Sequence, residues 1–103
     1  MTTHNATPSV VFRLSRAAED LVIESWGGIH TVYQRASGET HAFNEVTMAL
    51  VDCLRQGPAA FDYILRCVAA DFGVREEELV AGEFMPVALR LEDLGLIERT
   101  VAP

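Results

Sequence analysis

Hydrophobic residues change their spacing at Asn44, and this change limits the fold more than any other feature of the sequence. Before Asn44 they gather in three short runs, Val10–Ser15, Leu21–Trp26 and Ile29–Arg35, which contain many of the β-branched and aromatic residues that favour strands. After Asn44 they recur about every 3.6 residues, which is the repeat of a helix with one buried face. The sequence therefore predicts a β-rich first half and a helical second half.

A hairpin turn is expected after the third run. Ser37 and Gly38 can form a two-residue turn, because glycine adopts the positive φ that a tight hairpin needs. The chain then returns as a short strand, Glu39–Phe43, and a two-residue turn would place His41 opposite Gln34. This pattern predicts a small antiparallel sheet of three strands.

Three apolar stripes at helical spacing follow the sheet. Asn44 can cap the first helix, because its side chain accepts a hydrogen bond from an unpaired N–H of the first turn. Pro86 fits only the first turn of a helix, so the last helix is expected to begin near Glu83–Met85. The three stripes consist of Val46, Ala49, Leu50, Cys53 and Leu54, then Phe61, Ile64, Leu65, Val68 and Phe72, and finally Phe84, Val87, Ala88, Leu91 and Leu94.

The chain of 103 residues is long enough for one domain. We expect a single α+β domain over residues 10–97, winged-helix-like, in which a three-stranded antiparallel sheet is followed by a three-helix bundle. Residues 1–9 are expected to be a frayed N-terminus and residues 98–103 a C-terminal tail. The polar start lacks the pattern of a secretory signal and no apolar run approaches ~20 residues, so we expect a cytoplasmic protein.

The charge balance disfavours nucleic acids and membranes as partners. Fifteen acidic residues outnumber eight basic residues, all of them arginine, and the formal net charge is −7. On the last predicted helix, Arg90 stands beside Glu83, Glu92 and Asp93, and this segment would repel a DNA backbone. Anionic lipid surfaces are disfavoured for the same reason. We therefore expect no nucleic-acid partner and no membrane partner.

The polar residues form no pattern typical of a catalytic or metal site. His30 and His41 lie on neighbouring predicted strands and can share one face, but no cysteine or carboxylate stands at metal-ligand spacing. The acidic run Glu76–Glu78 fits a solvated helix start. Ser25 and Ser37 lack the context of a nucleophilic serine, and no phosphate-binding loop occurs. We expect no enzymatic activity, no metal and no cofactor.

The sequence contains two cysteines, Cys53 and Cys67. Each lies on the apolar stripe of a predicted helix, and no Cys-x-x-Cys pattern is present. Free cysteine packs as a small hydrophobic residue, so we interpret the pair as reduced thiols in the core. A redox pair or a disulfide is the alternative.

The predicted sheet offers an edge to which a peptide can bind. An edge strand presents unpaired N–H and C=O groups, and an extended peptide can pair with them as an additional strand. Glu39–Phe43 is short and polar enough to stay soluble while unpaired. Two alternatives remain open at this point, in which the edge is covered by the N-terminal strand or by a second subunit.

A family resemblance rests on two segments. The run Ser37-Gly38-Glu39-Thr40-His41-Ala42-Phe43-Asn44, with Trp26 upstream, and the ending Leu91-Glu92-Asp93-Leu94-Gly95-Leu96-Ile97 resemble PqqD-like peptide chaperones. These are recognition elements for ribosomally synthesised, post-translationally modified peptides. More narrowly, the chain resembles the PqqD family of the HPr-rel-A system, whose members are encoded beside HPr-kinase-related proteins. The resemblance extends from about Val10 to Ile97.

This resemblance implies a non-catalytic peptide chaperone. Such a protein binds the leader of a precursor peptide by strand addition and presents the peptide to a modifying enzyme, here a radical SAM or HPr-kinase-related enzyme. It implies that the leader pairs with the strand Glu39–Phe43 and lies in a groove against the helix at about Glu83–Leu94. The peptide-binding candidates are Glu39, Thr40, His41, Ala42, Phe43, Val87, Arg90, Leu91 and Leu94.

The candidates are expected to contribute in different ways. Thr40 and Ala42 would make alternating contacts beside the edge, whereas His41 and Phe43 would point to the opposite face. Arg90 can hold a carboxylate of the leader in a bidentate pair. The alternatives are a solvated surface arginine or a pair with the nearby Glu83 or Asp93. Two other functions stay open, a winged-helix regulator that binds DNA and a module that forms homodimers through its edge strands.

Overall fold

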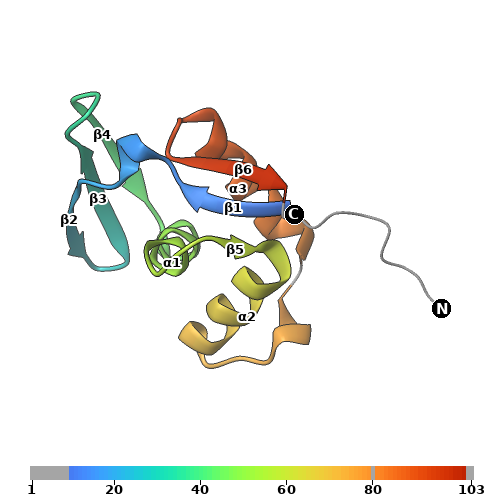
Figure 1. Cartoon of the computed structure of the whole chain (residues 1–103). Helices are drawn as coiled ribbons and strands as arrows, with labels where there is room; N and C mark the ends of the chain where they lie inside the picture. Colours follow the sequence, from blue (N-terminus) through green and yellow to red (C-terminus); the bar gives the residue numbers. More distant parts are fainter. Residues whose placement is uncertain (1–9, 80, 102–103) are drawn as a thin grey trace.

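The computed structural model describes residues 10–79 and 81–101, and Figure 1 shows their arrangement. Over these residues the protein is a mixed α+β fold with two three-stranded antiparallel sheets and three α-helices. The frayed N-terminus predicted for residues 1–9 lies outside the described residues. The elements, in chain order, are β1 (Val10–Leu14), the 3-10 turn η1 (Arg16–Ala18), β2 (Leu21–Trp26), β3 (Ile29–Gln34), β4 (Glu39–Phe43), α1 (Glu45–Arg55), β5 (Ala59–Ala60), α2 (Phe61–Phe72), the 3-10 turn η2 (Glu76–Glu78), α3 (Ala81–Asp93) and β6 (Ile97–Val101).

The predicted three-stranded antiparallel sheet is confirmed as the meander β2–β3–β4. Gly27 and Gly28, both at positive φ, form the tight turn between β2 and β3, which brings Trp26 opposite Ile29. In Figure 1 this meander stands at one end of the molecule, beside α1. The strand β4 lies at one edge of the meander, as the sequence predicted.

The register between β3 and β4 differs from the prediction. The loop between these strands comprises residues 35–38, so His41 pairs with Val32 and Gln34 pairs with Glu39. A two-residue turn of the favoured type needs positive φ at both central residues, but no non-glycine residue in the described part of the chain has a positive φ. Instead Gly38, at φ 75°, donates its N–H to the Gln34 carbonyl at 2.8 Å, which closes a four-residue loop.

The second sheet was not predicted. Strand β1 is the centre of the order β5–β1–β6 and therefore does not belong to the meander. Residues 98–101 are not the tail that the sequence predicted, because they extend β6 and pair with β1 from Glu98 to Val101. The signal was weak, because β6 mixes two charged residues into a five-residue strand that directly follows a helix and a turn.

The helices follow the predicted stripes, with one correction. Asn44 caps α1 as predicted, since its Oδ1 accepts the Thr47 N–H at 2.9 Å. The expected start of the last helix near Glu83–Met85 is wrong, because α3 begins at Ala81 and Pro86 lies beyond its first turn. The missing N–H of Pro86 leaves the carbonyl four residues earlier, on Gly82, without a helical partner. Gly82 is exposed, so water can hydrogen-bond to that carbonyl.

Buried side chains from both sheets and all three helices meet in one core. The largest of them are Phe12, Leu50, Ile64, Leu91, Leu96, Ile97, Val32, Val51 and Val68. At the end of α3, Gly95 (φ 78°) allows the chain to turn directly into β6, with the Leu96 N–H donating to the Leu91 carbonyl at 3.0 Å. Among the described residues, no helix has both the length and the apolar composition needed to cross a membrane.

Candidate functional site

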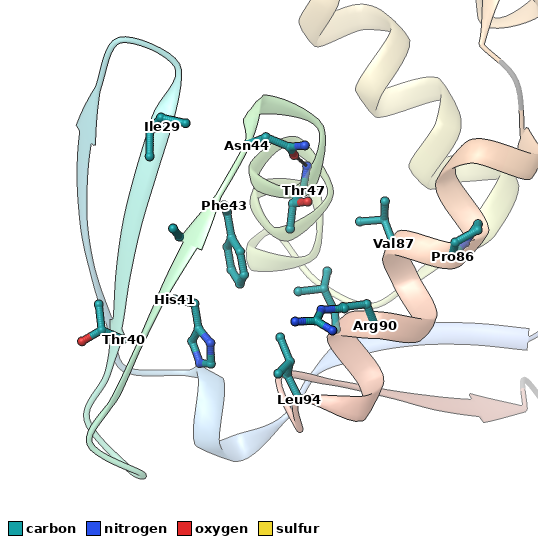
Figure 2. Close-up of a pocket in the computed structure, with 12 residues that line it drawn as sticks. Ile29, Thr40, His41, Phe43, Asn44, Thr47, Pro86, Val87, Arg90 and Leu94 are labelled. Carbon is teal, nitrogen blue, oxygen red and sulfur yellow. Dashed lines mark hydrogen bonds between the residues drawn. The ribbon is translucent and has the colours of Figure 1, made fainter.

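A groove of about 660 Å³ opens between β4 and α3 (Figure 2). We refer to it as the β4–α3 groove. One wall is β4 with the start of α1, and the other wall is the outward side of α3. The residues that line it are Ile29, Thr40, His41, Ala42, Phe43, Asn44, Thr47, Pro86, Val87, Arg90, Leu91 and Leu94.

The backbone of β4 presents unpaired hydrogen-bonding groups beside this groove. Gly38 donates to the Gln34 carbonyl, so the peptide groups of Gln34 face β4. Cross-strand partners in an antiparallel ladder alternate between facing each other and facing outward. With the pairs Gln34–Glu39 and Val32–His41 facing each other, the N–H and C=O groups of Thr40 and Ala42 point to the open edge.

This edge is not covered by the N-terminal strand, which was one alternative left open by the sequence. Strand β1 pairs on one side with β5 and on the other with β6. Within the described residues, the meander order β2–β3–β4 places only β3 beside β4. The other alternative, coverage by a second subunit, concerns a partner chain and stays open.

Side chains of β4 point in the opposite sense to the prediction. His41 and Phe43 point toward α3, whereas Thr40 points away from the helix (Figure 2). The reason is the packing of the meander on the core, because His41 shares a face with the buried Val32. Phe43 is buried and its ring stacks on the His41 ring, with 5.7 Å between centroids and 12° between planes. Thr40 and Ala42 therefore face the groove mainly through their backbone.

The polar part of His41 is held by a neighbour on β3. Its Nε2 lies 3.3 Å from Oε1 of Gln34, a buried side chain. An amide oxygen can only accept a hydrogen bond, so Nε2 is the donor in this contact. The imidazole is thus fixed in the groove wall by stacking on one side and by this hydrogen bond on the other.

The helical wall combines an apolar base with one cation. Leu91 is fully buried and belongs to the core, while Val87 and Leu94 are half-buried at the groove surface. Arg90 is exposed, and its guanidinium extends across the groove toward β4 (Figure 2). The alternative pairing of Arg90 with Glu83 or Asp93 is not found among the ion pairs of the described residues.

All of the predicted binding residues except Glu39 line this groove. Their part in binding a peptide stays a prediction. Four lining residues were missed, namely Ile29, Asn44, Thr47 and Pro86. Pro86 lies one helical turn before Arg90, so the helical repeat could have identified it. Asn44 was identified only as a helix cap. Ile29 lies on β3, whereas the candidates were taken only from the strand Glu39–Phe43 and the last helix.

A second polar cluster lies at the tip of the meander, outside the groove. The Ser25 hydroxyl is 2.7 Å from His30 Nδ1, and His30 Nε2 contacts a carboxylate oxygen of Glu45. None of these three residues lines the β4–α3 groove. The cluster joins β2, β3 and the first turn of α1, which fixes the meander against the helix. The sequence predicts His30 on a strand but carries no signal of its contacts with Ser25 and Glu45.

The two cysteines are unbonded thiols. Cys53 is buried in the core, as predicted, whereas Cys67 is only half-buried beside it. Burial and the neighbouring Cys67 thiol raise the pKa of Cys53 from its ordinary 9.0 to about 12, so Cys53 is a neutral thiol at physiological pH. Elsewhere, a bidentate pair of 2.8 and 2.7 Å joins Arg99 to Glu92 and lowers the pKa of the Glu92 carboxyl. Across residues 10–79 and 81–101, no three histidine, cysteine or carboxylate side chains gather as a metal site would require.

Comparisons with known proteins add no relative. No protein-family model matches the chain, no curated protein matches it, and no solved structure matches it. The open edge of β4, the groove beside it and the charges that surround it are therefore the observations from which a function can be inferred.

Proposed function

We propose that this protein is a non-catalytic peptide chaperone. It binds the leader of a precursor peptide as an additional strand on β4 and presents the peptide to a modifying enzyme, of the radical SAM or HPr-kinase-related class. We also propose that the chain is a PqqD-like protein and that its domain is winged-helix-like. The observation that carries it is the open edge of β4 beside a groove of about 660 Å³.

The groove suits an extended peptide in both of its parts. The Thr40 and Ala42 peptide groups are free to form ladder hydrogen bonds with an incoming strand. Every second side chain of that strand would point toward α3, because strand side chains alternate between faces. Those side chains would meet Val87 and Leu94, which are half-buried and apolar. Backbone pairing supplies affinity in this mode, and the pocket beside the strand supplies specificity.

A proline substitution tests the edge directly. Ala42→Pro removes an outward N–H and leaves the pairing of β4 with β3 in place. The probe is a synthetic copy of a short peptide encoded beside the gene of this protein, titrated into isotope-labelled protein and followed by NMR. We expect shifts on β4 and α3 in the wild type and a loss of binding in Ala42→Pro.

The matched control is Ala36→Pro, in the exposed loop 35–38 outside the groove. It introduces the same residue without removing an edge N–H of β4, so binding should persist. Urea unfolding of both variants establishes that they are folded. Undiminished binding by folded Ala42→Pro would contradict strand addition at β4.

Two further measurements separate the competing functions. DNA binding would weaken steeply with added salt because counterions are released from the phosphate backbone, whereas pairing of backbone groups changes little. A homodimer formed through β4 would dissociate on dilution, and size-exclusion chromatography over a range of concentrations would detect it. The proposal predicts peptide binding that weakens much less with added salt than DNA binding would, and a β4 edge that is free at low concentration.

A further inference from the structure

The β4–α3 groove has the opposite charge from the chain as a whole. The formal net charge of the protein is −7, yet none of the residues that line the groove is acidic. Arg90 is the permanently charged residue among them, and His41 is the other lining residue that can carry a positive charge. An acidic protein that keeps carboxylates out of one groove makes that groove a local site for anionic groups.

Among the described residues, Arg90 also differs from most arginines in forming no ion pair with a carboxylate. In the described part of the chain, five other arginines each form an ion pair, namely Arg13, Arg35, Arg55, Arg75 and Arg99. Arg90 instead extends its guanidinium across the groove toward β4 (Figure 2). The planar guanidinium offers parallel N–H donors that match the two oxygens of a carboxylate.

We infer that the β4–α3 groove selects an extended peptide with an acidic side chain that faces Arg90, and that it disfavours lysine or arginine at that position. This inference rests on the proposed function, because only strand addition on β4 places a peptide side chain opposite this arginine. The residues two positions before and after the acidic one point to the same side of the strand. They face the apolar surfaces of Val87 and Leu94, so the preferred pattern is an acidic residue flanked, at every second position, by apolar residues.

The expected selectivity is moderate because Arg90 is exposed in the unbound protein. An ion pair that stays in contact with water contributes little, but a bound peptide would cover one side of the guanidinium and exclude part of that water. We expect the dissociation constant of a glutamate peptide to be about fivefold to tenfold lower than that of its glutamine counterpart.

The test is a selection from a phage-displayed library of random peptides of about ten residues, enough to span one strand and its flanks. The library is selected on the wild type, Arg90→Glu, Arg90→Gln and Ala42→Pro. Arg66→Glu is the matched control, because Arg66 is exposed on α2 outside the groove and its reversal changes the net charge by the same amount. Circular dichroism and urea unfolding verify that each variant is folded.

We expect the wild type and Arg66→Glu to select peptides with an acidic residue at one fixed position. Arg90→Gln should lose this bias, and Arg90→Glu should select lysine or arginine at that position. An acidic bias that persists in Arg90→Glu, or a wild type without any charge bias, would overturn the inference while the proposed function stands, provided that Ala42→Pro abolishes selection. If Ala42→Pro selects the same peptides as the wild type, the proposed function fails and this inference fails with it.

Discussion

Asn44 connects β4 directly to α1, and its side chain caps the helix that forms one end of the β4–α3 groove. Its Oδ1 accepts the Thr47 N–H at 2.9 Å. Asn44→Ala removes this acceptor and leaves a first-turn N–H without a protein partner. Replacement of such a cap by alanine costs about 0.5–2 kcal/mol. Because Asn44 is exposed and water can approach the freed N–H, we expect a loss near the middle of that range, about 1 kcal/mol.

This loss is measurable by chemical and thermal unfolding. A loss of about 1 kcal/mol in a domain of this size lowers the melting temperature by about 4–8 °C. With a slope of about 1–3 kcal/mol per molar urea, the urea midpoint should fall by about 0.3–1 M. The slope itself should stay unchanged, because the cap does not alter the surface exposed on unfolding.

Asn44→Asp is the matched control for the cap. Aspartate retains the acceptor and adds a negative charge at the positive end of the helix dipole. Its free energy of unfolding at pH 7 should equal or exceed that of the wild type, and it should decrease below pH 4 as the carboxyl is protonated. Asn44 does not act as a cap if Asn44→Ala is as stable as the wild type, or if Asn44→Asp at pH 7 loses as much stability as Asn44→Ala.

Three further predictions concern stability. Leu91→Ala should lower the free energy of unfolding by about 2.7–5 kcal/mol because Leu91 is fully buried. Arg90→Ala should change it by less than about 0.5 kcal/mol because Arg90 is exposed. Urea unfolding of both variants measures this difference between a core residue and a surface residue of the groove. Since the unfolded thiol of Cys53 ionises at its ordinary pKa of 9.0 and the folded one at about 12, the unfolded chain loses a proton that the folded chain keeps. The free energy of unfolding should therefore fall as the pH rises from about 9 to 12, and less steeply in Cys53→Ala. A chain that ends at Leu96 should lose its cooperative thermal transition, because it lacks Ile97, which is fully buried, and all of β6.

The elements with strong local signals could be predicted from the sequence. The bounds of β2 and β4 agree with the prediction, because glycine turns and β-branched residues mark them. The cap at Asn44 was predicted correctly for a similar reason, since capping depends on residues close together in the sequence. Local chemistry is enough for features of this kind.

Features that depend on distant parts of the chain were missed. Strand β6 exists because it pairs with β1, some 85 residues earlier by the Arg13–Glu98 contact, and nothing near it in the sequence signals this partner. The predicted partner of His41 was wrong because the loop between β3 and β4 has four residues instead of two. The two additional loop residues move the partner of His41 from Gln34 to Val32. In the groove, the sequence identified both walls, but the side of β4 that faces α3 depends on which face of the meander packs on the core, and it was assigned in reverse.

Amide hydrogen exchange at the edge of β4 tests strand addition most directly. The Thr40 and Ala42 N–H groups point to the open edge, so they should exchange rapidly in the free protein. With the tightest-binding peptide from the library at saturation, we expect both amides to become strongly protected while the loop amides of residues 35–37 keep their rates. Rapid exchange at Thr40 and Ala42 in a protein saturated with peptide would contradict strand addition and place the peptide elsewhere.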